Sequence, residues 1–172
     1  DFNFRTATPF VSVPAGVQLE IGIAPGSSTS AMDVLTTFKP TLAPNGRYIA
    51  VANGVLNSQS YAQNPDMIAI DFTLFTKDGI RNQANNGSNV DLLVLHGSTD
   101  APTVDVIARD VTTIVDDAPY GAITDYISVP ADNYILDITP GNDNNTVVAS
   151  FKADLSSLNG SAIVVFASGF LN

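Results

Sequence analysis

The sequence contains no cysteine and no tryptophan, and only 7 of its 172 residues are lysine or arginine. Without cysteine, the chain cannot form a disulfide, a thiolate nucleophile or a cysteine-ligated metal centre. Long apolar runs are also missing. Residues 162–167 form one of the longest, and they are far shorter than the about 20 residues that cross a bilayer as a helix. We therefore expect no membrane insertion.

The shortage of basic residues leaves a strong acidic excess. Seventeen aspartates and glutamates oppose the seven basic residues, which gives a formal net charge of -10. This charge repels phosphate backbones, so we do not expect nucleic acid as a partner. The acidic residues are spread thinly along the chain, which favours a solvated exterior surface over an acidic recognition patch. With 45% hydrophobic residues, the chain can still bury a core.

The hydrophobic pattern predicts an all-β protein. Apolar and polar residues alternate through residues 17–23 and 68–74, as in strands with one buried face. Residues 92–95 and 163–166 are apolar at every position, which predicts central strands covered on both faces. Both runs should be among the least exposed parts of the chain. Turn formers separate the strands, and no segment shows a convincing amphipathic helix.

An internal comparison predicts that one unit occurs twice. Residues 13–26 match 129–141 with one residue of slack, beginning with Val-Pro-Ala in both stretches. Further landmarks follow in the same order at a nearly constant offset: residues 37–39 match 150–152, 45–46 match 159–160, and 54–57 match 169–172. The shared order of strands and turns indicates a duplication.

The phase of this duplication predicts two incomplete repeats. We expect a first repeat over residues 1–80, a linker over 81–89 and a second repeat over 90–172. The first repeat should lack counterparts of the strands predicted near 91–95 and 103–108. The second should lack its last strand, which is the counterpart of residues 67–75. The linker assignment rests on the Asn, Gln and Gly residues of 81–89.

Residues 93–106 read Leu-Val-Leu-His-Gly-Ser-Thr-Asp-Ala-Pro-Thr-Val-Asp-Val. This stretch resembles the opening signature of the bacterial domain of unknown function family 4397, in which His-Ala-Ser-Pro-Asp-Ala-Pro precedes a Val-Asp-Val strand. The Val-Pro-Ala-Gly turn at 13–16 and its counterpart at 129–132 are also similar to that family. The chain departs from the pattern at Gly97, Thr99 and Asp132, substitutions that a loop can absorb.

The resemblance implies an immunoglobulin-like β-sandwich that occurs, often in tandem, in exported and cell-surface bacterial proteins without established catalytic activity. Combined with the internal comparison, the prediction is an all-β chain of two tandem immunoglobulin-like antiparallel β-sandwich repeats, with strands missing at the chain's start and end. The expected location is extracellular or on the bacterial cell surface.

A catalytic site is not predicted. His96 is the only histidine, and Ser98 and Asp100 lie beside it in sequence. Three residues within one turn cannot converge on a substrate carbonyl as a nucleophile, a base and an orienting acid. We interpret them as a turn network with His96 packed at a strand end. A hydrolase would lose activity on His96→Ala, but we expect no enzyme and no cofactor.

Calcium is the one metal for which the sequence offers weak candidates. The candidate oxygen-rich sites are Asp100 with Asp105, the neighbours Asp116 and Asp117, and Asp143 in the loop of residues 141–145. Calcium takes six to eight oxygen ligands, and each of these clusters supplies too few carboxylates alone. We favour solvated loops at these positions.

Strand edges are the candidate assembly sites. Phe2 and Phe4 alternate with polar residues, which predicts a strand over residues 1–7. Ile163 and Val165 belong to the last predicted strand, which the missing strand would leave unpaired. Because an open edge presents unpaired backbone groups, it is an association site. Either another strand fills this edge, or the chain is a fragment of a longer protein with more repeats.

The sequence therefore predicts a non-catalytic structural or adhesive module of a bacterial surface protein or extracellular filament. Its partners would be other copies of itself or neighbouring repeats of a longer chain. The alternative is an extracellular carbohydrate- or calcium-binding module, which the loops rich in Asn and Asp suggest.

Overall fold

The structure is a computed structural model that describes residues 3–171. These residues form eleven strands and two short 3-10 helices, so the predicted all-β class is confirmed. The chain divides into two compact units. Unit 1 holds the residues up to 51 and residues 76–79, and unit 2 holds residues 52–75 and those from 80 onward. Within residues 3–171, no helix has the length and apolar character needed to cross a membrane.

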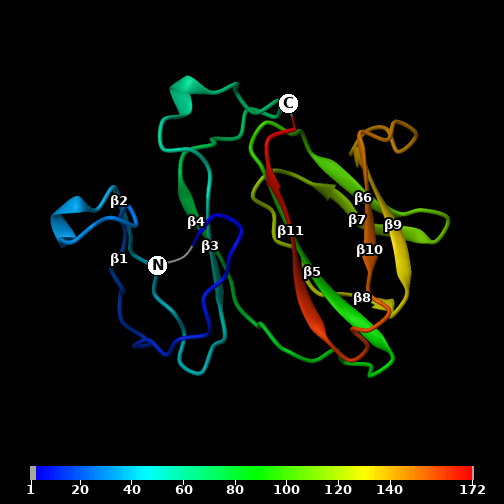
Figure 1. Cartoon of the computed structure of the whole chain (residues 1–172), viewed down its shortest axis with the longest axis horizontal. Helices are drawn as coiled ribbons and strands as arrows, with labels where there is room; N and C mark the ends of the chain where they lie inside the picture. Colours follow the sequence, from blue (N-terminus) through cyan, green and yellow to red (C-terminus); the bar gives the residue numbers. More distant parts are fainter. Residues whose placement is uncertain (1–2, 172) are drawn as a thin grey trace. The chain divides into compact units, whose positions relative to one another are not determined.

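Unit 2 contains two sheets (Figure 1). The four-stranded sheet is antiparallel and has the order β10 (Ala149–Asp154), β9 (Asn133–Pro140), β6 (Val104–Ala108), β7 (Thr112–Ala118). The three-stranded sheet has the order β11 (Ala162–Gly169), β5 (Asn89–Ser98), β8 (Ile127–Pro130).

One pair in the three-stranded sheet departs from the antiparallel arrangement that the sequence predicted. β8 runs antiparallel to β5, whereas β11 runs parallel to it, with Ile163 opposite Leu92. The preceding strand, β10, lies in the other sheet. The chain therefore crosses between sheets before β11, and a crossover rather than a hairpin permits parallel pairing.

Side chains from both sheets of unit 2 meet in one hydrophobic core, as in a two-layer sandwich. β5 and β7 each contribute three buried residues to the core, and β6, β8 and β9 contribute one each. β10 and β11 add the partly buried Ala153, Ile163 and Val165. The buried members are Val90, Leu92, Val94, Ala108, Ile114, Val115, Ala118, Val129, Tyr134 and Leu155.

β5 is buried on both faces, as predicted. Leu92, Leu93, Val94 and Leu95 are 2%, 0%, 8% and 0% exposed. Alternate side chains of a strand point to opposite faces, so neither face of β5 contacts solvent here. The strand is central in its sheet, between β11 and β8.

The same prediction was wrong for residues 163–166. Ile163 and Val165 pack against the core, but Val164 and Phe166 are 43% and 37% exposed. The reason is the position of β11, which is an edge strand of its sheet and is paired along its length with β5 alone among the named strands of residues 3–171. Both runs are wholly apolar, but only β5 has a neighbour on each side.

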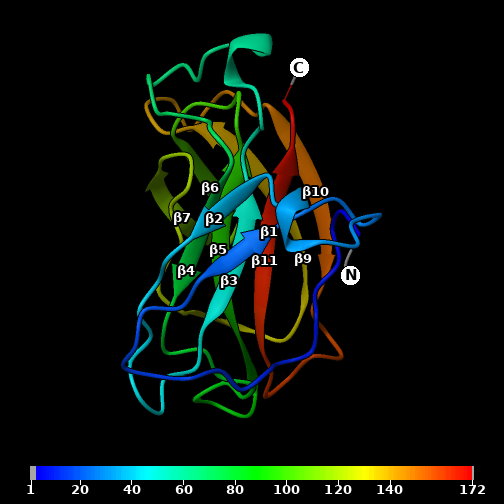
Figure 2. The ribbon, with the colours of Figure 1, turned by 90° about the vertical axis from the view of Figure 1, so that its left-hand side faces the viewer.

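Unit 1 contains the short pair β1 (Ile21–Ile23) and β2 (Thr36–Phe38), shown in Figure 2. A 3-10 helix over Ala31–Asp33 lies between them, and Ser30 and Asp33 form a capping box at its start. β3 (Ile49–Asn53) and β4 (Thr73–Lys77) form a further two-stranded sheet, whose residues are divided between the two units. A second 3-10 helix, Ser58–Ser60, follows β3 in unit 2.

The predicted strand over residues 1–7 is not present in its described part. Phe4 lies in an exposed turn, which the Thr6 N–H closes by donating to the Asn3 carbonyl at 3.1 Å. The Thr6 hydroxyl adds two hydrogen bonds to the Asn3 backbone, at 2.9 and 2.7 Å. Such local side-chain bonds compete with strand pairing. Phe2 lies outside the described residues.

The two short hairpins that the internal comparison matched have the same register. β1 pairs Ile21 with Phe38, and β9 pairs Leu136 with Phe151. Counting from the matched prolines Pro25 and Pro140, these are equivalent positions. The next two pairs along each ladder are equivalent as well. This agreement supports the duplication, while the proposed repeat boundaries remain a prediction.

The residues of the predicted linker, 81–89, lie within unit 2 and bond to it at several points. Arg81 forms an ion pair with Asp91, and its guanidinium lies 4.2 Å from the centroid of the Tyr126 ring. The Asn85 N–H donates to Asp91 at 3.0 Å. Burial alone would raise the pKa of Asp91, but hydrogen bonds from Ser128, Asn85 and Arg81 outweigh it and lower the pKa.

The double burial of β5 yields a stability prediction. Leu93→Ala should lower the free energy of unfolding by about 2–5 kcal/mol, because it removes part of a fully buried side chain and leaves a cavity in its place. Val164→Ala, on the half-exposed face of β11, should cost less than about 1 kcal/mol. Urea denaturation followed by circular dichroism measures both, and equal costs would contradict the assignment of β5 as central and β11 as edge.

Candidate functional site

Residues 96–103 comprise the end of β5 and the connection to β6, and we call them the signature loop. His96 is buried near the end of β5, where its ring meets Tyr120 edge-on at 6.3 Å. Its Nε2 lies 3.0 Å from the Pro102 carbonyl oxygen. A carbonyl only accepts, so Nε2 carries the proton and Nδ1 is the acceptor for the Ser98 N–H at 3.4 Å. Burial lowers the pKa of His96, which keeps the ring neutral.

The three residues considered as a triad do not have the geometry of one. The Ser98 hydroxyl donates to Asp100 at 3.3 Å, and both ring nitrogens of His96 contact the backbone. A serine nucleophile needs its hydroxyl hydrogen-bonded to the histidine that removes its proton. In this arrangement the side chains instead fix the path of the loop.

Asn64 enters the signature loop from the segment that follows β3. Its side-chain amide is 1% exposed and donates to the carbonyls of Thr99 and Ala101, both at 2.9 Å. Its carbonyl oxygen accepts the Asp66 N–H at 2.9 Å. All polar atoms of this buried side chain are therefore used, as burial requires.

Asp66 adds a second contact from the same segment. Its Oδ2 accepts the Thr103 N–H at 2.5 Å and the Thr103 hydroxyl at 2.9 Å. We call residues 61–67 the docking segment. Through two side chains, it satisfies two carbonyls, one N–H and one hydroxyl of the signature loop.

A third segment reaches the same place. The Leu171 N–H donates to Asp100 at 2.7 Å, and the Phe170 ring stacks on Tyr61 with 5.3 Å between centroids and 4° between planes. The chain leaving β11 therefore contacts both the signature loop and the docking segment.

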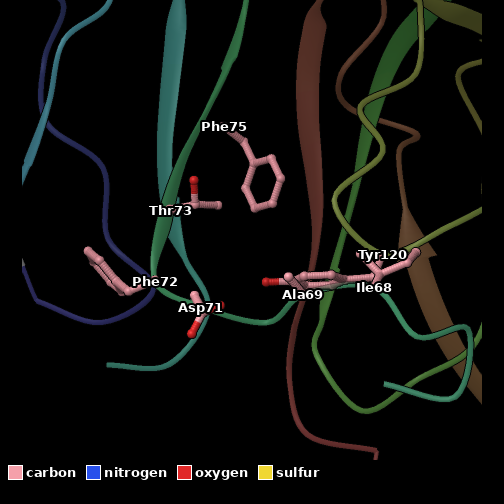
Figure 3. Close-up of a pocket in the computed structure, with 7 residues that line it drawn as sticks. All are labelled: Ile68, Ala69, Asp71, Phe72, Thr73, Phe75 and Tyr120. Carbon is pink, nitrogen blue, oxygen red and sulfur yellow. The ribbon is translucent and has the colours of Figure 1, made fainter. Parts of the chain in front are cut away.

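A cavity of about 270 Å³ lies beside this junction (Figure 3). Phe75 meets Tyr120 edge-on at 5.9 Å, and the Tyr120 hydroxyl is buried without a hydrogen-bond partner. Burial raises the pKa of Tyr120. Gly121 has φ of 85°, and a Cβ there would lie 2.6 Å from the Phe75 ring, so only glycine fits. The lining residues are Ile68, Ala69, Asp71, Phe72, Thr73, Phe75 and Tyr120.

The five candidate calcium ligands are mostly apart. Asp105 and Asp117 meet at a β-bulge, where the Asp117 N–H donates to Asp105 Oδ1 at 2.6 Å, while the buried Oδ2 has no partner. Asp116 is exposed, Asp100 belongs to the signature loop, and Asp143 accepts bonds within its own turn. Over residues 3–171, no three His, Cys, Asp or Glu side chains gather where they could hold a metal. Calcium binding stays a prediction.

β11 is an edge strand of its sheet, but its outward backbone groups belong to residues other than Ile163 and Val165, which the sequence suggested. Assembly at this edge stays a prediction. The Asp91 N–H bonds the Ser161 carbonyl, so odd-numbered residues of β11, including Ile163 and Val165, bond to β5. Even-numbered residues face away from β5, and Ala162 at the start of the strand donates to Asn82. The edge-facing residues are therefore Val164 and Phe166.

Sequence reasoning also missed an ion pair in the four-stranded sheet. Arg109, in the turn after β6, binds Asp137 of β9 through two bonds of 2.7 and 2.6 Å. Its guanidinium and the Ser150 hydroxyl hold the pKa of Asp137 at about 2. These residues lie 28 apart in sequence, and no local pattern links them.

This ion pair predicts an acid-sensitive component of stability. The folded pKa of Asp137 is depressed to about 2 from 3.8, so its contribution is complete above pH 4 and disappears as the pH falls from about 4 to 2. Asp137→Asn should flatten the pH dependence of the unfolding free energy in this window, measured by urea titration. Asp116→Asn, at an exposed position, should leave the dependence unchanged. Identical curves for the wild type and Asp137→Asn would refute this account.

The hydrogen bonds of Asn64 predict a large loss of stability when its side chain is truncated. Asn64→Ala should cost about 1–3 kcal/mol, because the carbonyls of Thr99 and Ala101 lose their donors. Asn64→Asp should cost more, since a carboxylate oxygen would face those carbonyls. The exposed Asn159→Ala is the control, and chemical denaturation is the measurement. A cost for Asn64→Ala no greater than that of the control would rule out this role.

One of the comparisons with known proteins found a match, and it covers the second half of the chain. No curated protein and no solved structure matches. The resemblance that the sequence predicted is confirmed for residues 90–172, which match the family model described as Domain of unknown function (DUF4397).

Proposed function

We propose that this chain is a non-catalytic structural or adhesive module of a bacterial surface protein or extracellular filament, in which sheets of neighbouring repeats or copies join through strand edges. The observation that carries the proposal is the open edge of β11. The bacterial exterior as its location rests on the family resemblance.

The edge of β11 has the properties of a pairing site. The strand is eight residues long, and its backbone groups at Val164 and Phe166 face away from β5. The side chains of these two residues are partly exposed and apolar. Natural proteins block long exposed edges with charges, proline or bulges. Residues 162–169 contain no charged residue and no proline.

The internal comparison indicates what would pair there. β3 is the counterpart of β11, and it is paired with β4. The pairing extends beyond β3, because the Val55 N–H donates to Ile70 and its carbonyl accepts the Phe72 N–H, both at 2.9 Å. Val55 matches Phe170 in the repeat. We therefore propose a strand of the same kind as residues 70–77, from another repeat or copy, as the occupant of the β11 edge.

The signature loop supports a role without catalysis. Its histidine, serine and aspartate bond to the backbone or to each other, and its carbonyls hold the docking segment. The residues that carry the family resemblance thus join parts of the chain.

The edge makes a prediction about self-association. The wild-type chain should associate with rising concentration in sedimentation velocity, and Val164→Pro should reduce this, because proline removes an outward N–H without breaking a bond to β5. Val147→Pro, in the exposed loop before β10, is the control. Circular dichroism verifies that both variants fold.

A second measurement does not depend on a substitution. A synthetic peptide of residues 68–77 should inhibit the association of the wild-type chain, and a peptide of the same composition in scrambled order should not. A wild-type chain that stays monomeric at its highest soluble concentration would overturn the proposal. So would association that neither Val164→Pro nor the peptide reduces.

A further inference from the structure

We infer that the signature loop is a recognition site for an Asn-x-Asp segment, and that a neighbouring repeat or a second copy of this chain can supply that segment. The inference concerns a different surface from the β11 edge and does not depend on strand pairing. It starts from what the loop presents: two carbonyls, those of Thr99 and Ala101, followed by the N–H and hydroxyl of Thr103.

These groups select the chemistry of the partner. Two convergent carbonyls accept two N–H donors, which a single Asn side-chain amide provides and an Asp or Ser side chain does not. The Thr103 N–H and hydroxyl need one acceptor, which a carboxylate provides with a charge-assisted bond. Asn64 and Asp66 meet both needs at one-residue spacing, and the bond from the Asp66 N–H to Asn64 Oδ1 fixes that spacing before docking.

The docking segment is held by these polar contacts more than by apolar burial. Asn64 is 1% exposed, while Tyr61 and Met67 on either side of it are 48% and 71% exposed. Gly54, upstream of the segment, and Met67, its last residue, have φ of 92° and 61°. Because little apolar surface is lost when the segment leaves, replacing it with an identical segment from elsewhere costs little.

The internal comparison explains why the supplier would be a repeat of the same kind. The docking segment follows residues 54–57, which match 169–172 at the end of β11. In the second of these stretches, Leu171 binds Asp100 of the signature loop and Phe170 stacks on Tyr61 of the docking segment. The stretch that leaves β11 therefore lies at the signature loop and at the docking segment.

Peptide binding tests the inference. The full-length double variant Asn64→Ala, Asp66→Ala vacates the loop, and a fluorescent peptide of residues 57–72 should bind it in an anisotropy titration. The wild type should bind at least tenfold more weakly, because its own segment competes at a high effective concentration. An Asn64→Ala peptide should lose at least tenfold in affinity, and an Asn57→Ala peptide should bind like the original.

The titration is repeated in chains that also carry Val164→Pro, so that an effect on the β11 edge is distinguishable from one on the loop. Unchanged binding there supports an independent site. Equal binding of the original and the Asn64→Ala peptide, or no binding to the vacated chain, would overturn the inference.

Hydrogen exchange provides a test if the double variant does not fold. In the single variant Asp66→Ala, amides of residues 58–67 should exchange at least tenfold faster, while those of β5 and β6 stay protected. Uniform exchange rates in the variant and the wild type would also count against recognition by these side chains.

Discussion

The burial of β5 on both faces is the constraint on which the rest of unit 2 depends. One face of this strand completes the sandwich core with residues such as Val90 and Leu92, and Leu93 and Leu95 on the other face are equally shielded from solvent. A strand in that position needs neighbours on both sides and a cover on each face. β8 and β11 are the neighbours. Because they hold β5 in place, the loop that follows β5 begins at a fixed position.

Because its position is fixed, the signature loop can bind the docking segment. The neutral ring of His96 packs against Tyr120 and donates to the Pro102 carbonyl. These contacts shape the loop so that the carbonyls of Thr99 and Ala101 both accept from Asn64. Buried carbonyls without donors are costly, so the loop is stable in this form only with a partner. Recognition here arises from backbone groups that need partners, and the side chains of the loop mainly hold it in shape.

The sequence predicted β5, β6 and β11 of unit 2, because alternation and apolar runs report burial directly. It did not distinguish the centre of a sheet from its edge: residues 92–95 and 163–166 have the same apolar character, and only the strand order separates them. It predicted a strand at residues 1–7 because a two-residue alternation says nothing of the Thr6 hydroxyl that closes the turn. Asn64 and Arg109 were missed for a related reason, since their partners lie 28 to 37 residues away and no periodic pattern marks them.

The parallel pairing of β5 with β11 has a mechanical consequence. β5 is the first strand of the stretch that matches the family model and β11 is the last. Because the two strands run in the same direction, the start of β5 and the end of β11 lie at opposite ends of their ladder. Tension applied between the start of β5 and the end of β11 would pull these strands lengthwise past each other, so that all the hydrogen bonds between them share the load at once. An antiparallel hairpin pulled from its two adjacent ends would instead open one bond at a time.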